Sequence, residues 1–289
     1  MSANLLTGKE VAQKIESEIR ESIVMLGEKG VTPSLTIVGV GNAPDAITYA
    51  NRIKKAADKL SIACTIEFLP DTTSQNEFIA ILKEKSSNKK IHGIIVLRPL
   101  PTHIKEETLK YLIDPGKDID CFNPINAGKI FEGDLSGFAP ATAEAVMEIL
   151  HFYNIPISGR ETVVIGRSMI VGKPLSMLLL KENATITICH SKTESLPAVC
   201  KRADILVAAI GKSKMVTKDY IKDNATVIDV GINVDGDSLT GDVNFEQVKD
   251  VAGAITPVPG GVGVVTTKIL LKHVVKAAMM NKDSFTAKA

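Results

Sequence analysis

The sequence lacks the cysteine spacing of a zinc site or of a disulfide framework. Its four cysteines lie far apart in the chain and include no Cys-x-x-Cys pair. No apolar run approaches the roughly 20 residues that span a bilayer, and residues 1–9 lack the apolar core of a signal peptide. We therefore expect a cytoplasmic protein with reduced thiols, no metal site and no membrane segment.

The sequence also lacks an excess of charge of either sign. Its 34 Lys and Arg residues balance 33 Asp and Glu residues, which leaves a formal net charge of +1. Nucleic-acid and anionic-membrane surfaces need a basic excess, so neither partner is expected and small molecules are favoured. With 289 residues, of which 45% are hydrophobic, the chain has room for two modest domains.

Hydrophobic periodicity predicts an opening helix followed by alternating strands and helices. Thr7 and Glu10 form a capping box in front of an amphipathic stretch that reaches about Lys29. β-rich runs alternate with helical stretches, the runs at 34–40, 64–69 and 91–97 and the helical stretches at 46–60 and 74–85. Alternation of this kind is typical of a parallel sheet.

A second alternating series follows the Gly- and Pro-punctuated segment 114–140. Its expected strands are near-continuous apolar runs at 162–165, 185–189, 205–209 and 226–230. Such runs indicate strands covered on both faces, as in a doubly wound nucleotide-binding fold. A last amphipathic helix is expected from about Val265 to Met280, after a Pro- and Gly-rich cluster at 257–263.

A glycine turn follows the expected strand 162–165 and leads into a helical stretch. Gly166 and Gly172 flank this turn, which also contains Arg167 and Ser168. Glycine lets the backbone approach a pyrophosphate, and the N-terminus of the next helix presents unpaired N–H groups to it. The spacing is not Gly-x-Gly-x-x-Gly, so a plain tight turn is the alternative interpretation.

The end of the next expected strand favours a nucleotide that carries a 2′-phosphate. An NAD enzyme usually places an acidic residue there, whereas this chain has Cys-His-Ser-Lys-Thr at 189–193. Ser191 and Lys192, together with Arg167, offer the donors and the positive charge that a 2′-phosphate needs. We therefore expect NADP as the cofactor. The alternative is that Arg167 and Lys192 are ordinary solvated charges.

With these residues in place, the sequence resembles the bifunctional methylenetetrahydrofolate dehydrogenase/cyclohydrolases over nearly its whole length. The motifs that carry the resemblance are Val-Ile-Gly-Arg-Ser at 164–168, Ile-Val-Gly-Lys-Pro at 170–174, Asp-Val-Gly-Ile-Asn at 229–233, Gly-Asp-Val at 241–243 and Ile-Thr-Pro-Val-Pro-Gly-Gly-Val-Gly at 255–263. Together they are highly specific. The resemblance implies an NADP-dependent oxidoreductase of one-carbon metabolism that forms a homodimer.

The resemblance also implies an α/β fold with two domains. Residues 1–140 would form an N-terminal α/β substrate domain, to which the C-terminal helix within 265–289 returns. Residues 141–264 would form a Rossmann-like NADP domain around a doubly wound parallel sheet.

Individual site residues follow from the same resemblance. Contacts with NADP are implied for Gly166, Arg167, Ser168, Ser191 and Ile232, and the glycine turn and basic pocket described above add Gly172 and Lys192. A loop beside the tetrahydrofolate derivative, in the cleft between the domains, would contain Pro257, Pro259, Gly260 and Gly261.

Tyr49 and Asp120 match two substrate-side positions of the family. Tyr49 matches the tyrosine of the helix that lines the cleft, and Asp120 matches the aspartate that holds the pterin. A carboxylate accepts paired hydrogen bonds, and a pterin edge offers an amino group and a ring N–H. The alternative is that Asp120 caps a turn and Tyr49 fills the core.

Two polar residues of the family pattern are aliphatic in this chain. The family lysine lies one helical turn after the tyrosine, where this chain has Ile53, and the accompanying glutamine corresponds to Leu97. Lys54 and Lys55 point in other directions because each residue turns a helix by about 100°. Arg52 is nearly on the correct face, but its guanidinium does not deprotonate and cannot act as a base.

These departures favour a dehydrogenase whose cyclohydrolase activity is weak or lost. Hydride transfer needs position and electrostatics, whereas hydrolysis of the methenyl product needs a general acid–base group. Three alternatives stay open. They are a fully bifunctional enzyme with a relocated base such as Lys54, a catalytically dead paralogue that binds nucleotide or pterin, and a dehydrogenase that acts on a different pterin.

Overall fold

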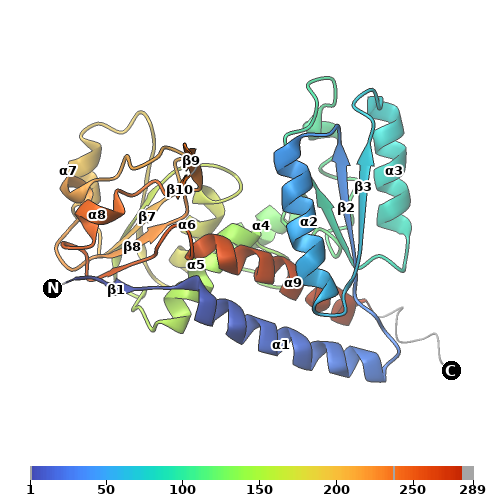
Figure 1. Cartoon of the computed structure of the whole chain (residues 1–289), viewed down its shortest axis with the longest axis horizontal. Coiled ribbons are helices and arrows are strands. Elements are labelled where there is room, and N and C mark those ends of the chain that lie inside the picture. The colour runs from blue at the N-terminus through green and yellow to red at the C-terminus, as the bar shows by residue number, and fades with distance from the viewer. Residues whose placement is uncertain (1, 237, 282–289) are drawn as a thin grey trace. The chain divides into compact units, whose positions relative to one another are not determined.

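The computed structural model describes residues 2–236 and 238–281 and divides the chain into two compact units (Figure 1). Unit 1 contains the residues up to Lys14 and Pro140–Thr266, and unit 2 contains Ile15–Ala139 and the residues from Thr267 onward. Within the described ranges, no helix is both long and apolar enough to cross a membrane.

The start of the chain differs from the expected division, which placed residues 1–140 together. The segment up to Lys14 belongs to unit 1, where β1 (Asn4–Leu5) pairs in parallel with β11 (Ala254–Ile255). Strands of two residues carry no periodic signal, which is why both were missed. The expected final helix is α9 (Val262–Met280), and residues 282–289 of its expected range lie outside the described residues.

Unit 1 is built on a six-stranded parallel sheet with the order β1-β11-β8-β7-β5-β6. Its longer strands are β5 (Glu161–Ile165), β6 (Thr185–Cys189), β7 (Ile205–Ala208) and β8 (Thr226–Asp229). The chain pairs β6 on one side of β5 and then β7 on the other. This reversal creates a switch point, where open α/β sheets bind their ligands.

Helices cover both faces of the unit 1 sheet. They are α5 (Ala141–Phe152), α6 (Gly172–Lys181), α7 (Leu196–Cys200), α8 (Phe245–Val248) and the 3-10 helix η2 (Lys218–Tyr220). Val163 and Leu206 share a core with residues of α7, η2 and α8, whereas the alternate residues Val164 and Val207 are buried on the opposite face. The doubly wound fold expected from the apolar runs is confirmed. A short antiparallel pair, β9 (Asn233–Asp235) and β10 (Ser238–Thr240), was not expected.

Unit 2 is built on a three-stranded parallel sheet with the order β3-β2-β4. Its elements are β2 (Ser34–Val40), β3 (Ala63–Leu69), β4 (Gly93–Val96), α2 (Pro44–Asp58), α3 (Gln75–Ser87), the 3-10 helix η1 (Glu106–Thr108), α4 (Pro124–Glu132) and most of α1 (Gly8–Glu28). Figure 1 shows α2 and α3 on opposite sides of β2 and β3. Val38 and Val96 pack against Phe78 and Leu82 of α3, which places one core between the sheet and this helix.

The turn after β5 brings backbone segments very close together. Gly166 has φ +136°, and a Cβ added to it would lie 2.3 Å from the carbonyl oxygen of Ala209. A Cβ on Gly172, the first residue of α6, would lie 2.1 Å from the carbonyl oxygen of Gly166. Neither position has room for a side chain. Glycine at both positions therefore allows the start of α6 to pack directly against the end of β5.

We expect the Gly172→Ala variant to unfold more easily than the unmodified protein. The added methyl group collides with backbone, which should lower the free energy of unfolding by about 1–3 kcal/mol. Gly128→Ala is the matched control, because a Cβ at this exposed helical position meets nothing within 4 Å. It should raise the free energy of unfolding by about 0.5–1 kcal/mol. Urea unfolding measures both, and equal effects would contradict the close packing.

Candidate functional site

The glycine turn and the end of β6 lie side by side in unit 1. The N–H of Gly166 donates to the carbonyl oxygen of Cys189 at 2.9 Å, which joins the two segments. The Arg167 side chain is exposed and has no ion-pair partner within the described ranges. The hydroxyl of Ser168 accepts the N–H of Val171 at 3.1 Å and so shapes the turn before α6.

A second turn follows β6 and presents Ser191 and Lys192. The N–H of His190 donates to Thr193 Oγ1 at 2.9 Å, and the N–H of Lys192 donates to His190 Nδ1 at 3.1 Å. These bonds hold the turn while both side chains stay exposed. Three polar or basic groups, Arg167, Ser191 and Lys192, are therefore presented by neighbouring turns of unit 1, in an arrangement suited to an anion.

Asp242 ties three loops of unit 1 together. Its fully buried carboxylate accepts the N–H groups of Ile210, Gly211 and Lys212 at 2.6–3.0 Å. It also accepts the side-chain amide of Asn233 at 3.0 Å. Since a buried carboxylate without donors would be very costly, this network fixes the loop after β7 against the segment that holds Asp242.

Asp229, at the end of β8, also joins separate loop segments through its buried carboxylate. Its carboxylate accepts the N–H groups of Gly231, Asp242 and Val243, each at 2.9 Å. Its own N–H donates to Thr256 Oγ1 at 2.8 Å, which connects β8 with the Pro- and Gly-rich loop that follows. Burial raises the pKa of the Asp229 carboxyl to about 6, against the lowering effect of the N–H donors.

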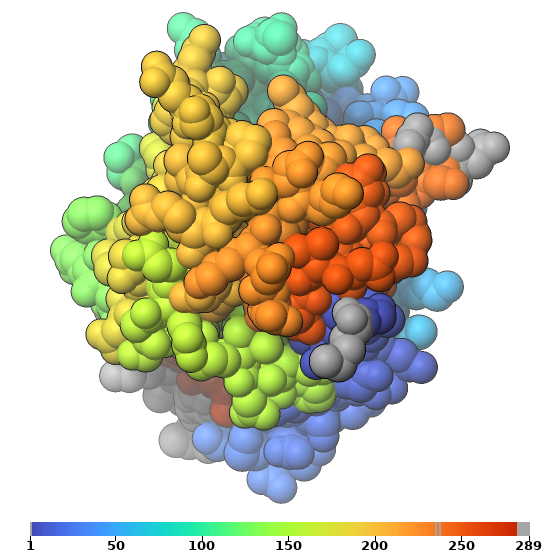
Figure 2. Space-filling view, turned by 90° about the vertical axis from the view of Figure 1, so that its left-hand side faces the viewer, coloured from blue at the N-terminus to red at the C-terminus, as the bar shows by residue number. Residues whose placement is uncertain are grey.

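The expected substrate loop lies beside Ile232 within unit 1. A Cβ on Gly263 would be 3.1 Å from Cδ1 of Ile232, and the Ile232 side chain is 58% exposed. The carbonyl oxygen of Gly260 accepts the N–H of Gly8 at 2.8 Å. Thr256, which is bonded to Asp229 of β8, directly precedes this loop in the sequence. The loop contains the expected residues Pro257, Pro259, Gly260 and Gly261. Figure 2 shows one face of the molecule in a space-filling view. The atoms coloured yellow to orange, from β6 to α8, form one continuous area of this surface.

Tyr49 and Asp120 are brought together in unit 2. Burial and, to a smaller extent, the nearby Asp120 carboxylate raise the pKa of the Tyr49 phenol to about 12, while the charge of Arg52 opposes the shift. The phenol therefore stays protonated at neutral pH and can donate a hydrogen bond but cannot serve as a base. Both side chains are half-buried, as a substrate-facing pair would be.

Asp118 organises the segment that presents Asp120. Its carboxylate, 1% exposed, accepts the N–H groups of Phe122 and Asn123 at 2.8 Å and the side-chain amide of Asn126 at 2.9 Å. Burial raises the pKa of Asp118, while these donors oppose the shift. The motif residues Asp118, Asp229 and Asp242 were missed as loop organisers. For Asp229, which lies between Ile228 and Val230, an acid at the end of an apolar run was the available signal.

The two aliphatic departures lie in the interior of unit 2. Ile53 is 0% exposed on the buried side of α2, with Ala50 and Ala57. Leu97, which directly follows β4, is 6% exposed, and its Cδ1 lies 3.2 Å from a Cβ position on Gly39. Neither side chain can bind or transfer a proton.

The basic residues next to Ile53 on α2 point in different directions. Lys54 donates from Nζ to the carbonyl oxygen of Cys64 at 2.9 Å and pairs with Asp58 at 3.3 Å, so its ammonium lies at the start of β3. Arg52 instead stacks on Tyr49, with its guanidinium carbon 5.4 Å from the ring centroid. Of these two side chains, Arg52 is therefore the one that contacts Tyr49.

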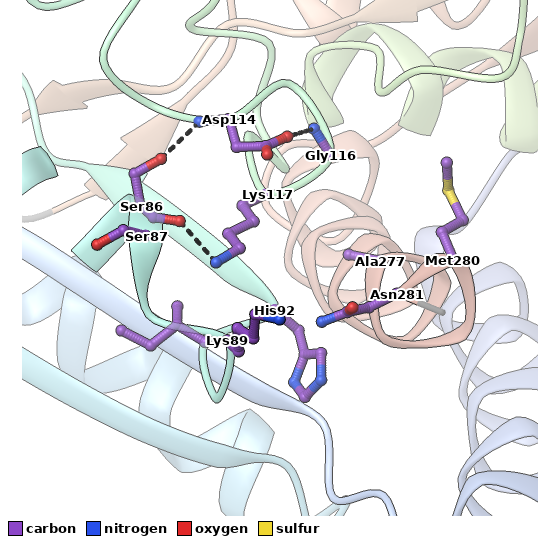
Figure 3. Close-up of a pocket in the computed structure, with 11 residues that line it drawn as sticks. Ser86, Ser87, Lys89, His92, Asp114, Gly116, Lys117, Ala277, Met280 and Asn281 are labelled. Atoms are coloured by element: carbon purple, nitrogen blue, oxygen red, sulfur yellow. Dashed lines mark hydrogen bonds between the residues drawn. The ribbon is translucent and has the colours of Figure 1, made fainter. Parts of the chain in front are cut away.

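A separate cavity of about 500 Å³ opens in unit 2 beside the ends of α3 and α9 (Figure 3). Lys117 donates from Nζ to the carbonyl oxygens of Ser86 and Asn88 at 2.6 and 2.8 Å, and Ser86 Oγ accepts the N–H of Asp114 at 2.8 Å. These bonds hold the end of α3 to the neighbouring loop. None of the expected site residues lines the cavity. The described residues contain no group of three or more His, Cys, Asp or Glu that could hold a metal ion.

Two family models and the most similar relatives match nearly the whole chain. Residues 140–282 match the family model of the tetrahydrofolate dehydrogenase/cyclohydrolase NAD(P)-binding domain, and residues 6–120 match that of the catalytic domain. The chain is 50% identical to "Bifunctional protein FolD" of Clostridium botulinum, over 96% of this chain and 99% of that protein.

Solved structures agree with this assignment. A methylenetetrahydrofolate dehydrogenase/cyclohydrolase from Campylobacter jejuni has 38% identity and a TM-score of 0.94, with 96% of this chain and 99% of that chain covered. The Trypanosoma brucei enzyme, complexed with NADP cofactor and inhibitor, has 34% identity and a TM-score of 0.91, with 96% and 98% covered. The chain belongs to the tetrahydrofolate dehydrogenase/cyclohydrolase family.

Proposed function

We propose that the protein is an NADP-dependent methylenetetrahydrofolate dehydrogenase whose cyclohydrolase activity is weak or lost. The observation that carries this proposal is the burial of two aliphatic side chains, Ile53 and Leu97, where the family pattern has a lysine and a glutamine. The nucleotide half, by contrast, retains its glycine turn, its basic side chains and its loop-organising aspartates.

The residues of unit 1 fit NADP. The turn at Gly166 and Gly172 has no room for a Cβ, so backbone N–H groups and the start of α6 can come close to a pyrophosphate. Arg167, Ser191 and Lys192 would hold the 2′-phosphate through charge-assisted hydrogen bonds. When bound, the cofactor supplies a nicotinamide that accepts a hydride.

Orientation is sufficient for the dehydrogenase step. Hydride leaves the methylene carbon of the substrate, and the flanking nitrogen lone pairs stabilise the resulting methenyl cation, so no protein group has to move a proton. In the proposal, Asp120 accepts hydrogen bonds from the pterin amino group and ring N–H, and Tyr49 lines the same site. Both roles need a fixed geometry, which Asp118 supplies for Asp120.

The cyclohydrolase step places a demand that Tyr49 and Lys54, with their observed pKa shift and partners, are poorly suited to meet. Water must add to the methenyl cation and a nitrogen must then be protonated, which is general acid–base work. The Tyr49 phenol has a pKa of about 12, and Lys54 is bonded to Cys64 and Asp58. Without a suitable group, the hydrolytic rate should fall by about 10² to 10⁴.

A fully bifunctional enzyme is the second candidate, because the Clostridium botulinum relative is named bifunctional. It would require a base other than the family lysine. Lys54 would have to give up its two partners and reorient by about 100° around α2 to serve. This requirement makes the bifunctional candidate the weaker of the two.

We expect Arg167→Ala to weaken NADP binding by about ten- to a hundredfold and to leave NAD binding nearly unchanged. The reason is the loss of charge-assisted bonds that only the 2′-phosphate makes. Isothermal titration calorimetry with both nucleotides measures the ratio. Arg160→Ala is the matched control, since Arg160 precedes β5 at its opposite end. An unchanged NADP/NAD ratio in Arg167→Ala would defeat the assignment of Arg167.

Asp120→Ala should lower kcat/KM for methylenetetrahydrofolate by at least about a hundredfold, because the pterin donors lose their acceptor. NADP affinity should change by less than about twofold, since the nucleotide residues belong to unit 1. Steady-state kinetics and calorimetry on the same preparation measure the two effects. Normal turnover in the variant would show that Asp120 does not hold the pterin.

The double variant Ile53→Lys/Leu97→Gln should gain methenyl hydrolysis. A lysine at position 53 lies one turn after Tyr49, and burial lowers a lysine pKa toward the range useful for a base. We expect a hydrolysis rate at least about tenfold above that of the unmodified protein, with a much smaller change in the dehydrogenase step.

Ile53→Lys alone is the control for this gain. Its ammonium group lacks the glutamine partner, so the single variant should recover little methenyl hydrolysis. Loss of methenyl absorbance at fixed pH, in a buffer of low nucleophilicity, measures the rate. Efficient hydrolysis by the unmodified protein would refute the explanation and would make Lys54 the first residue to replace.

A further inference from the structure

Ile232 is a large aliphatic residue that is exposed and yet held on both sides. Its side chain is 58% exposed, whereas the residues before and after it are bonded to buried carboxylates. The N–H of Gly231 donates to Asp229 at 2.9 Å. On the other side, the side-chain amide of Asn233 donates to Asp242 at 3.0 Å. A backbone fixed in this way gives the exposed side chain a defined position toward a ligand.

The two carboxylates also hold each other's segments. The N–H of Asp242 donates to the Asp229 carboxylate at 2.9 Å. A Cβ on Gly231 would collide with the Asp242 carboxylate, and a Cβ on Gly241 would collide with the Asp229 carboxylate. Glycine at both positions therefore lets the two segments approach this closely. We call Asp229, Asp242 and Asn233 the carboxylate clamp.

The strand order indicates which part of a dinucleotide would lie beside Ile232. The sheet runs β8-β7-β5-β6, with the basic turn for the 2′-phosphate after β6 and the glycine turn for the pyrophosphate after β5. A dinucleotide crosses the carboxyl ends of such a sheet at the switch point, with one half on each side. The nicotinamide half would therefore lie over β7 and β8. Ile232 follows β8, and the loop at 210–212 follows β7.

We propose that the carboxylate clamp positions Ile232 for contact with the nicotinamide of NADP, and that Asn233 and Asp242 are positioning residues for hydride transfer. Asp242 also accepts the N–H groups of residues 210–212, so one side chain holds the loops after β7 and β8 in a single arrangement. This inference rests on the proposed NADP-dependent dehydrogenase.

The physical basis is that position affects hydride transfer and cofactor binding differently. A displacement of about 1 Å costs about a hundredfold in rate, even when its origin is remote from the reacting atoms. The affinity for NADP depends mainly on its phosphates, which are assigned to the glycine turn and the basic turn. Loss of the clamp should therefore slow hydride transfer and leave NADP binding nearly unchanged.

The first test is Asn233→Ala, because replacing Asp242 would leave several buried donors without an acceptor. With enzyme in excess over methylenetetrahydrofolate, we expect the single-turnover rate constant for NADPH formation to fall by about three- to tenfold. The Kd of NADP, measured by calorimetry, should change by less than about twofold. A misfolded fraction would lower the amount of active enzyme and not this rate constant.

Thr240→Val is the matched control. Thr240 lies opposite Asn233 in the β9–β10 pair, and its Oγ1 is 2.9 Å from Ser213 Oγ in the loop after β7. The variant cuts another bond between the same two segments outside the clamp, so it should keep the rate constant within about twofold.

Hydrogen exchange of the protein without NADP is an independent measurement. The amides of residues 229–233 should exchange faster in Asn233→Ala and at the normal rate in Thr240→Val, because only the first variant opens the clamp. Equal exchange in the two variants, or equal losses of the rate constant, would overturn the inference.

A double-variant cycle tests whether Asn233 acts through Ile232. Ile232→Ala should lower the same rate constant, and adding Asn233→Ala to it should cause little further loss. If the two losses multiply in the double variant, Asn233 acts independently of Ile232 and the inference is wrong.

The inference and the proposed function fail in different ways. An unmodified protein that forms no NADPH from methylenetetrahydrofolate contradicts the proposed function, and the inference fails with it. An unmodified protein that forms NADPH, together with an Asn233→Ala variant that keeps the full rate constant, contradicts the positioning role alone. An Asn233→Ala variant that loses NADP affinity but keeps its rate constant at saturation contradicts that role as well.

Discussion

Buried aspartates that accept backbone N–H groups are the interaction on which the candidate site residues of each unit depend. In unit 1, Asp229 and Asp242 join the loops after β7 and β8 to the Gly-Asp-Val segment. In unit 2, Asp118 joins the turn that contains Asp120 to the start of α4. A buried carboxylate is tolerated only when donors surround it, so each of these residues forces its loop into one conformation. Site residues on loops thereby gain the rigidity of the sheet.

The cost of burying an unpaired polar group also explains how two polar residues of the family pattern can be replaced by aliphatic ones without loss of the fold. Ile53 and Leu97 are buried and aliphatic, and such side chains stabilise an interior position. Had only one of the two polar family residues been replaced, the other would be left buried without its partner, at a cost of about 1–3 kcal/mol. Replacing both avoids that cost. The pair of changes is therefore physically consistent, and under the proposed function it would remove a proton-transfer group while the surrounding core is kept.

Long apolar runs made much of the fold predictable from the sequence. The expected strands 34–40 and 185–189 coincide with β2 and β6, because Val and Ile runs between turns define their own ends. β1, β11 and the pair β9–β10 were missed, since strands of two or three residues are determined by their partners and not by their own sequence. The expected strand 91–97 is shorter in the structure, where His92 already turns its ring to accept the N–H of Ser34.

The candidate site was predictable where a motif has a local chemical meaning. The glycine turn and the Ser191–Lys192 turn follow adjacent strands, so their proximity follows from sheet topology. The stacking of Arg52 on Tyr49 and the bonding of Lys54 to Cys64 were not predictable, because a helical position gives a direction but not a partner. These two contacts decide which of the two cations contacts Tyr49.

The central claim is that the protein oxidises methylenetetrahydrofolate but does not hydrolyse the product efficiently. The most direct measurement follows NADPH and methenyltetrahydrofolate in one reaction of the unmodified protein, in a buffer of low nucleophilicity. The account predicts that the methenyl species accumulates in step with NADPH and then decays at the rate seen without protein. NADPH formation without methenyl accumulation would contradict it, because the cyclohydrolase step would then be intact despite Ile53 and Leu97.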